Sequence, residues 1–188
     1  LWNNIQGIGF KSISTPLAWM GVYAYTIQLY FDFSGYSMMA MGLGKMLGFE
    51  FPRNFAHPYL AKSVSEFWRR WHITLGRWFR EYVYIPLGGN RGGKARMFLN
   101  LFIVWSLTAL WHGAAPNYLI WGASLLILLL IEKLFLLRYL EKSHILCHVY
   151  LLLVVPLTWV AFAITDIKEL GIYYTRLFPF WGAAAYVN

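Results

Sequence analysis

The feature that most limits how this chain can fold is a pair of long apolar runs with one histidine between them. Residues 97–111 and 118–131 hold mostly aliphatic and aromatic side chains, and His112 lies in the stretch that joins them, LWHGAAPN (110–117). Runs of this kind are suited to the hydrocarbon core of a bilayer. An ionisable group at or near membrane depth is costly, and such a group usually faces the protein interior at a functional site. The sequence therefore predicts a membrane protein in which His112 belongs to the site.

The composition supports a membrane protein and argues against several other classes. Only 13% of the 188 residues are charged, against about 25% in soluble domains, and 20% are aromatic, which is typical of segments that end at membrane interfaces. The net charge of +8 is explained by basic loops on the cytoplasmic side, so we expect no nucleic-acid partner. The single cysteine, Cys147, excludes an intrachain disulfide. No histidine and acidic residue have the spacing of a metal site, so no metal is predicted.

Apolar runs and turn signals divide the chain into helical segments. Residues 16–33 would form a helix about 27 Å long, enough for a membrane helix that ends at Asp32. Four glycines in residues 35–49 favour a packed, short or re-entrant element. Residues 145–164 predict a further span kinked at Pro156, whereas residues 1–15 are expected to be a connection and residues 165–188 an amphipathic or interfacial element.

The region around His112 is too long for a single span. One helix over residues 97–131 would measure about 52 Å, against a hydrocarbon core of about 30 Å. Gly113 and Pro116 predict a break, hence a hairpin of two helices with His112 near its turn. Basic residues on both outer flanks place those flanks on the cytoplasmic side.

The expected fold is therefore all-α, a polytopic transmembrane helical protein with about four to six membrane segments and an amphipathic interfacial helix. The interfacial helix is predicted over residues 63–84, where charged and aromatic side chains alternate with helical periodicity and Ser63 and Glu66 fit a capping box. Because the chain begins at Leu1 and lacks a signal-peptide pattern, residues 1–188 are expected to be an internal part of one membrane domain, without its N- and C-terminal helices.

Several residues could carry chemistry. Imidazole has an ordinary pKa near 6.5 and can accept a proton at neutral pH, so His112 suits a general base, with a packing histidine as the alternative. His72 falls on the aromatic side of the amphipathic helix, where packing and function are both open. Asp32 could bind a substrate hydroxyl or cap a turn with Ser34. The arginines of residues 69–80 are first of all cytoplasmic-side charges, but they could also bind the phosphates of an anionic cofactor such as coenzyme A; they are Arg69, Arg70, Arg77 and Arg80.

Long ordered motifs make the sequence similar to a known family. They are QLYFDFSGYS (28–37), NFAHPYL (54–60), EFWRRWHITL (66–75), WFR (78–80), YIPLGGN (84–90) and LWHG (110–113). With these motifs the chain strongly resembles the membrane-bound O-acyltransferases, and most closely the bacterial branch with alginate O-acetyltransferase and the D-alanyl-lipoteichoic acid transfer protein. The resemblance implies that the whole chain is part of one such membrane domain, in the cytoplasmic (inner) membrane of a bacterium and crossing it several times.

The resemblance also implies a reaction and a site. His112 and His72 match the family's two histidines, so His112 would deprotonate the acceptor hydroxyl and His72 would be its companion. The oxyanion donor stays open between His72, Asn117 and a backbone amide. The neighbouring residues Trp68, Arg69, Arg70, Trp71 and Trp111, together with Asp32 and Asn117, are candidates for substrate binding.

The substrates and partners follow from the same resemblance. The expected acyl donor is a cytosolic thioester such as acetyl-CoA, and the acceptor is an exported polysaccharide or a cell-wall polymer. A periplasmic or extracytoplasmic acyltransferase, or an acyl-carrier protein, is a candidate partner beside the lipid bilayer. Alternatives are transfer of a D-alanyl or fatty acyl group to teichoic acid, lipid or protein, and, outside enzymes, a transporter or a scaffold subunit.

Overall fold

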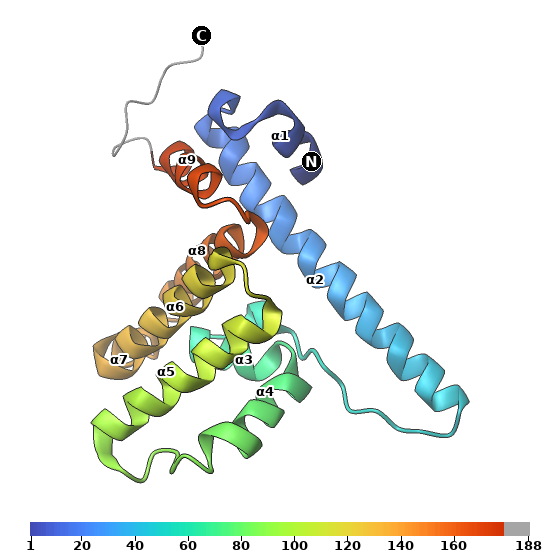
Figure 1. The fold of residues 1–188 in the computed structure, drawn as a ribbon, viewed down its shortest axis with the longest axis vertical. Helices are drawn as coiled ribbons and strands as arrows, with labels where there is room; N and C mark the ends of the chain where they lie inside the picture. Colours follow the sequence, from blue (N-terminus) through green and yellow to red (C-terminus); the bar gives the residue numbers. More distant parts are fainter. Residues whose placement is uncertain (179–188) are drawn as a thin grey trace.

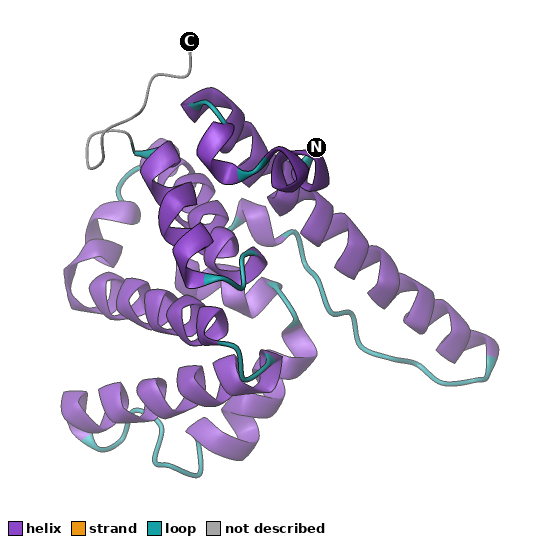
Figure 2. Ribbon diagram, turned by 45° about the horizontal axis from the view of Figure 1, so that its top comes forward, coloured by secondary structure: helices purple, strands orange, loops and turns teal. Residues whose placement is uncertain are grey.

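The structure is a computed structural model that describes residues 1–178, and all regular elements in this part of the chain are helical (Figure 2). This confirms the all-α fold. The longer helices are α2 (Thr15–Met46), α5 (Gly93–His112), α6 (Pro116–Ile131), α8 (His144–Ala163) and α9 (Ile167–Leu177). The shorter elements are α1 (Trp2–Ile8), η1 (Phe10–Ser12), η2 (Pro58–Leu60), α3 (Val64–Arg70), α4 (Ile73–Phe79), η3 (Arg80–Tyr84), η4 (Glu132–Leu136) and α7 (Leu137–Leu140).

Helix α2 corrects two predictions. Instead of a membrane helix that ends at Asp32 and a separate glycine-rich element, residues 15–46 form one helix of 32 residues, about 48 Å long. Its second half extends away from the other helices (Figure 1). A glycine inside a helix costs only about 1 kcal/mol, and this segment has no proline after its first turn, so the helix continues through the glycines. Residues 1–15, expected to be a connection, contain α1, which packs its Trp2 and Ile5 against α2.

Helix α6 contacts both α5 and α8 (Figure 1), and the hydrophobic core extends from these helices to α1, α2, α3 and α9. The break predicted at Gly113 and Pro116 is confirmed, because α5 ends at His112 and α6 begins at Pro116. The two helices approach closely at Gly122, where a Cβ atom would lie 2.9 Å from the Cβ of Ala109 and 3.1 Å from the carbonyl oxygen of Trp105. Any larger residue at this crossing would push the two helices apart, so the close contact of α5 with α6 requires glycine at position 122.

Two segments of residues 1–178 are long and apolar enough to cross a membrane. They are Pro116–Leu140, which continues α6 through η4 and α7, and His144–Ala163, which is α8 and remains helical through Pro156. Both lie where spans were predicted, while the larger number of segments and the cytoplasmic position of the hairpin flanks stay predictions. Helix α9 confirms an amphipathic element after residue 165; residues 179–188 of that prediction lie outside the described residues.

The amphipathic helix predicted over residues 63–84 is in fact divided. Helix α3 ends at Arg70, His72 adopts a left-handed conformation with φ 46°, and α4 begins at Ile73. The segment around Asn54 causes this break. Ala56 N–H donates to the carbonyl oxygen of Arg70 and Ile73 N–H donates to that of Asn54, each at 3.0 Å. These bonds replace helical ones, so helical periodicity in the sequence did not reveal the break.

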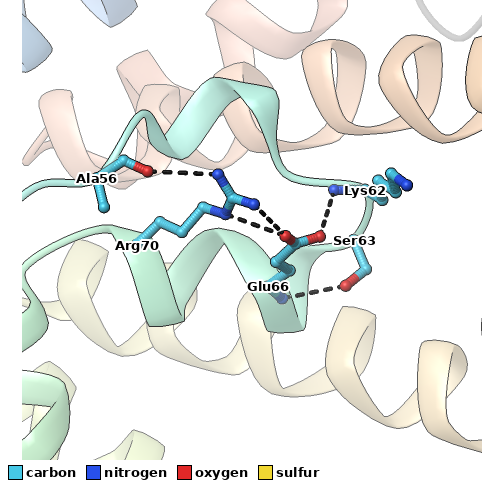
Figure 3. Close-up of polar contacts among 5 residues, drawn as sticks. All are labelled: Ala56, Lys62, Ser63, Glu66 and Arg70. Atoms are coloured by element: carbon cyan, nitrogen blue, oxygen red, sulfur yellow. Dashed lines mark hydrogen bonds and ion pairs between the residues drawn. The ribbon is translucent and has the colours of Figure 1, made fainter.

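The start of α3 forms the expected cap in a modified arrangement (Figure 3). The Ser63 hydroxyl accepts the backbone N–H of Glu66 at 3.0 Å. The Glu66 carboxylate accepts the N–H of Lys62, one residue earlier than in a standard capping box, and also pairs with the Arg70 guanidinium. Arg70 in turn reaches the carbonyl oxygen of Ala56 at 3.5 Å (Figure 3). This network connects α3 to the preceding loop.

A buried carboxylate holds α3 against the membrane helices. Glu132, directly after α6, is 1% exposed. Its two oxygens accept the N–H groups of Val64 at 2.5 Å and Ser65 at 3.0 Å. These are the first two residues of α3, whose N–H groups have no partner within their own helix. Glu132 therefore fixes the position of α3 relative to α6.

We predict that Glu132→Ala destabilises the protein by about 1–3 kcal/mol, because it leaves a buried N–H group and a partly buried one without an acceptor. The measurement is thermal unfolding of the purified protein in detergent. The exposed Glu141, at the end of the same helical segment, gives the control Glu141→Ala. Equal unfolding temperatures for the two variants would contradict the proposed role of Glu132.

Candidate active site

A single cavity brings the two histidines together. It has a volume of about 800 Å³ and is lined by residues of α2, α3, α4, η3, α5, α6, η4 and α8, with His72 and His112 both on its wall. The two histidines are 40 positions apart in the sequence and belong to different elements. The structure thus brings the two predicted histidines to one place, while their catalytic roles stay a prediction.

His112 is placed by the end of α5 and by aromatic rings. Gly113 ends the helix with φ 150°, and a Cβ atom there would lie 2.8 Å from the ring of Tyr118. The imidazole is half-buried and packs edge-on against Trp121 and Phe162, with ring centroids 4.9 Å and 5.1 Å away. No residue of the described chain forms a hydrogen bond with this ring. Both ring nitrogens of His112 are therefore available to a bound molecule.

His72 is held more tightly. Its Nδ1 lies 3.2 Å from Oδ1 of Asn54, and the same oxygen accepts the N–H of Thr74 at 3.2 Å and its hydroxyl at 3.0 Å. The ring also packs edge-on against Phe33 at 4.8 Å. Burial lowers the pKa of His72 below its ordinary value, which favours the neutral imidazole. The hydrogen bond leaves Nε2 as the nitrogen that is free for a ligand.

Positive charge lines part of the same cavity. Three exposed arginines, Arg69, Arg77 and Arg80, and the exposed Lys133 contribute to its wall, and Glu81 is its one acidic residue. Such an excess of guanidinium and ammonium groups is suited to phosphate. The cavity thus combines an aromatic part with two imidazoles and a cationic part.

The other residues predicted for the site divide between cavity and scaffold. Trp68, Arg69 and Trp71 line the cavity. Arg70 does not line the cavity, because its guanidinium donates hydrogen bonds to the Glu66 carboxylate and to the carbonyl oxygen of Ala56. The buried Asn117 donates its amide hydrogens to the carbonyl oxygens of Ala161 and Phe162, and so connects α6 to the end of α8.

Two further predicted residues are not part of the cavity wall. Trp111 is 57% exposed and contacts the rings of both His72 and His112 from outside. Asp32 is exposed within α2, so it neither ends the helix nor caps a turn, and it lies away from the cavity. The nearby Ser34 hydroxyl bonds to the carbonyl oxygen of Phe31 instead.

Sequence reasoning missed three residues that shape the site. Asn54 orients His72, Glu132 anchors α3, and Trp121 supports the His112 ring. Trp121 and Trp68 also have indole N–H groups that are buried without an acceptor in the described chain. Asn54 lies inside the motif NFAHPYL. A linear motif does not indicate that its side chain contacts His72, which is 18 positions away in the sequence.

Comparisons with known proteins identify the family of this chain. The sequence model of the membrane-bound O-acyltransferase family matches residues 4–174. The chain belongs to this family. The probable alginate O-acetylase AlgI of Pseudomonas syringae pv. tomato is 49% identical over 168 residues, which cover 89% of this chain and 32% of that protein.

Two other relatives are named for acceptor polymers other than alginate. The peptidoglycan O-acetyltransferase of Helicobacter pylori is 50% identical over 59% of this chain and 21% of its own length. The teichoic acid D-alanyltransferase of Bacillus subtilis is 36% identical over 63% of this chain and 31% of its own length. The chain thus spans about a third or less of these curated relatives.

Adjacent arginines of this O-acyltransferase chain should behave differently. Arg70→Ala removes the Glu66 pair and the bond to Ala56 and is expected to cost about 1 kcal/mol, reduced from the value of a buried pair because the groups are partly exposed. Arg69→Ala removes an exposed side chain and should change stability by less than about 0.5 kcal/mol. Denaturation of both variants in detergent checks this, and equal losses would show that Arg70 has no special structural role.

Proposed function

We propose that this chain carries the active site of a membrane-bound O-acyltransferase that moves an acyl group from a thioester to a hydroxyl group. The observation that carries the proposal is the cavity in which His72 and His112 lie together beside a cationic wall. Family membership supports the reaction class.

The proposed reaction begins with the acceptor hydroxyl close to a ring nitrogen of His112. As the hydroxyl oxygen attacks the thioester carbonyl carbon, its proton moves to His112. The tetrahedral intermediate then collapses, the carbon–sulfur bond breaks, and the departing thiolate takes the proton from the His112 imidazolium. The base is thereby regenerated, and the products are an ester and a free thiol.

Acetyl is the acyl group that the relatives favour. Two of the three relatives described above are named for acetyl transfer, and they are 49% and 50% identical to this chain. The acceptor would be an exported polysaccharide or a cell-wall polymer, in a bacterial cytoplasmic membrane that the protein crosses several times. Transfer of D-alanine to teichoic acid is the second candidate, supported by the relative that is 36% identical.

The cationic wall suggests how the donor binds. Acetyl-CoA and the phosphopantetheine of an acyl-carrier protein both have phosphate at the end of the pantetheine arm opposite the thioester. Arg77 and Arg80 would bind such phosphates while the thioester reaches the histidines. This arrangement places the donor on the side of α4 and η3, which we assign to the cytoplasmic face.

Replacing His112 tests the reaction directly. In the intact protein in membranes or detergent, His112→Ala should lower acetyl transfer from a thioester to polysaccharide by about 10²–10⁴-fold, because the general base is lost. His144→Ala, at the exposed start of α8, is the matched control and should keep full activity. Unchanged turnover in folded His112→Ala protein would rule out the proposed role.

The donor site has a separate test. The double variant Arg77→Ala/Arg80→Ala should raise the KM for acetyl-CoA at least about tenfold, because two charge-assisted contacts to phosphate are lost. The KM for a short acetyl thioester without phosphate should not change. Lys45→Ala, at the far end of α2, controls for loss of positive charge alone. Equal changes with both donors would show that the arginines do not bind phosphate.

A further inference from the structure

The hydrogen bonds around Asn54 determine which nitrogen of His72 carries a proton. The N–H of Thr74 can only donate, so the Asn54 atom that it reaches at 3.2 Å must be the amide oxygen. Turning the amide around would place its NH₂ group against this N–H. The orientation of the Asn54 side chain is therefore defined by the backbone of α4.

The same oxygen lies 3.2 Å from Nδ1 of His72. An oxygen that accepts a hydrogen bond from Thr74 has no hydrogen to offer, so a bond to His72 requires hydrogen on Nδ1. In the neutral imidazole the other nitrogen, Nε2, is then unprotonated. Burial of His72 favours this neutral form, as noted above.

We infer that Asn54 is a positioning residue that holds His72 in the Nδ1–H tautomer, with Nε2 available as a hydrogen-bond acceptor in the cavity. No hydrogen bond restricts His112 in the described chain, so of the two cavity histidines His72 is the one whose tautomer the protein determines. Its importance for catalysis rests on the proposed function, whereas the tautomer itself does not.

The inference changes the expected role of His72. A neutral imidazole with hydrogen on Nδ1 cannot donate from Nε2, so His72 is not the donor that stabilises the oxyanion. Instead, Nε2 can accept a hydrogen bond from a second hydroxyl of the polysaccharide acceptor and so orient it, while His112 removes the proton of the reacting hydroxyl. Loss of the Asn54 oxygen would allow hydrogen on Nε2, which would turn this acceptor into a donor.

Both Thr74 groups donate to the Asn54 oxygen, and His72 does so too in the inferred tautomer, which provides a sharp set of variants. Asn54→Asp keeps an acceptor oxygen for every partner. Asn54→Ala removes the acceptor from His72 and Thr74 together. Thr74→Val is the matched control, because it removes only the hydroxyl bond at 3.0 Å and leaves the bonds of His72 and of the Thr74 N–H in place.

The test is ¹⁵N NMR of histidine-labelled intact protein, with the His72 signals identified by their loss in His72→Gln. The parent, Asn54→Asp and Thr74→Val should show hydrogen on Nδ1, and Asn54→Ala should shift His72 towards the Nε2–H form. Acetyl transfer by Asn54→Ala should fall about 100-fold or more in kcat, as expected for an active-site histidine in the wrong tautomer, while KM for the thioester stays similar. Asn54→Asp should recover most of this loss.

Two results would overturn the inference. One is an Nε2–H tautomer of His72 in the parent protein, and the other is a tautomer that does not change in Asn54→Ala. If Asn54→Ala does not fold, the tautomer of His72 in the parent protein decides alone. A protein without any acyl transfer but with the expected NMR spectra would contradict the proposed function and leave the role of Asn54 intact.

Discussion

The left-handed turn at His72 is the conformation on which the cavity depends. A left-handed residue other than glycine costs about 1–2 kcal/mol, and here the bonds from Ile73 and Thr74 to Asn54 offset that cost. Because the chain turns at this point, Trp71 is buried at 4% exposure while His72 faces the cavity. The turn also sends α4 away from the axis of α3, and this brings Arg77 of α4 and Arg80 of η3 to the cavity wall.

The positions of both histidines depend on the same helix, α6. His112 depends on α6 because α5 lies against it at Gly122, and its ring packs on Trp121 of α6. His72 follows α3, whose start is held by Glu132 at the other end of the same helical segment. A shift of α6 would therefore move the two imidazoles together, which keeps their relative position in the cavity.

Features that depend on neighbours in the sequence could be predicted, and those that depend on distant partners could not. The break at Gly113 and Pro116 and the cap at Ser63 are local, and both were predicted correctly. The break at His72 depends on Asn54, so periodicity alone predicted one helix where there are two. The glycines of α2 predicted an end of the helix that does not occur, because no other segment of the described chain forms hydrogen bonds that would interrupt the helix there. Of the site, His112 was predicted from its place between two apolar runs and His72 from the family motifs. Their shared cavity, and the contacts of Arg70 and Asn117 that stabilise the fold, depend on tertiary structure.

The motif EFWRRWH shows how one short segment serves both fold and site. Residues four positions apart share a face of a helix, so Phe67 and Trp71 turn together into the aromatic core, and Glu66 and Arg70 turn together to the loop at Ala56. The remaining face carries Trp68 and Arg69 to the cavity, where the turn adds His72. A substitution on the first two faces changes the position of His72, whereas one on the third changes what the cavity can bind. Two adjacent arginines can therefore differ in role although they are chemically identical.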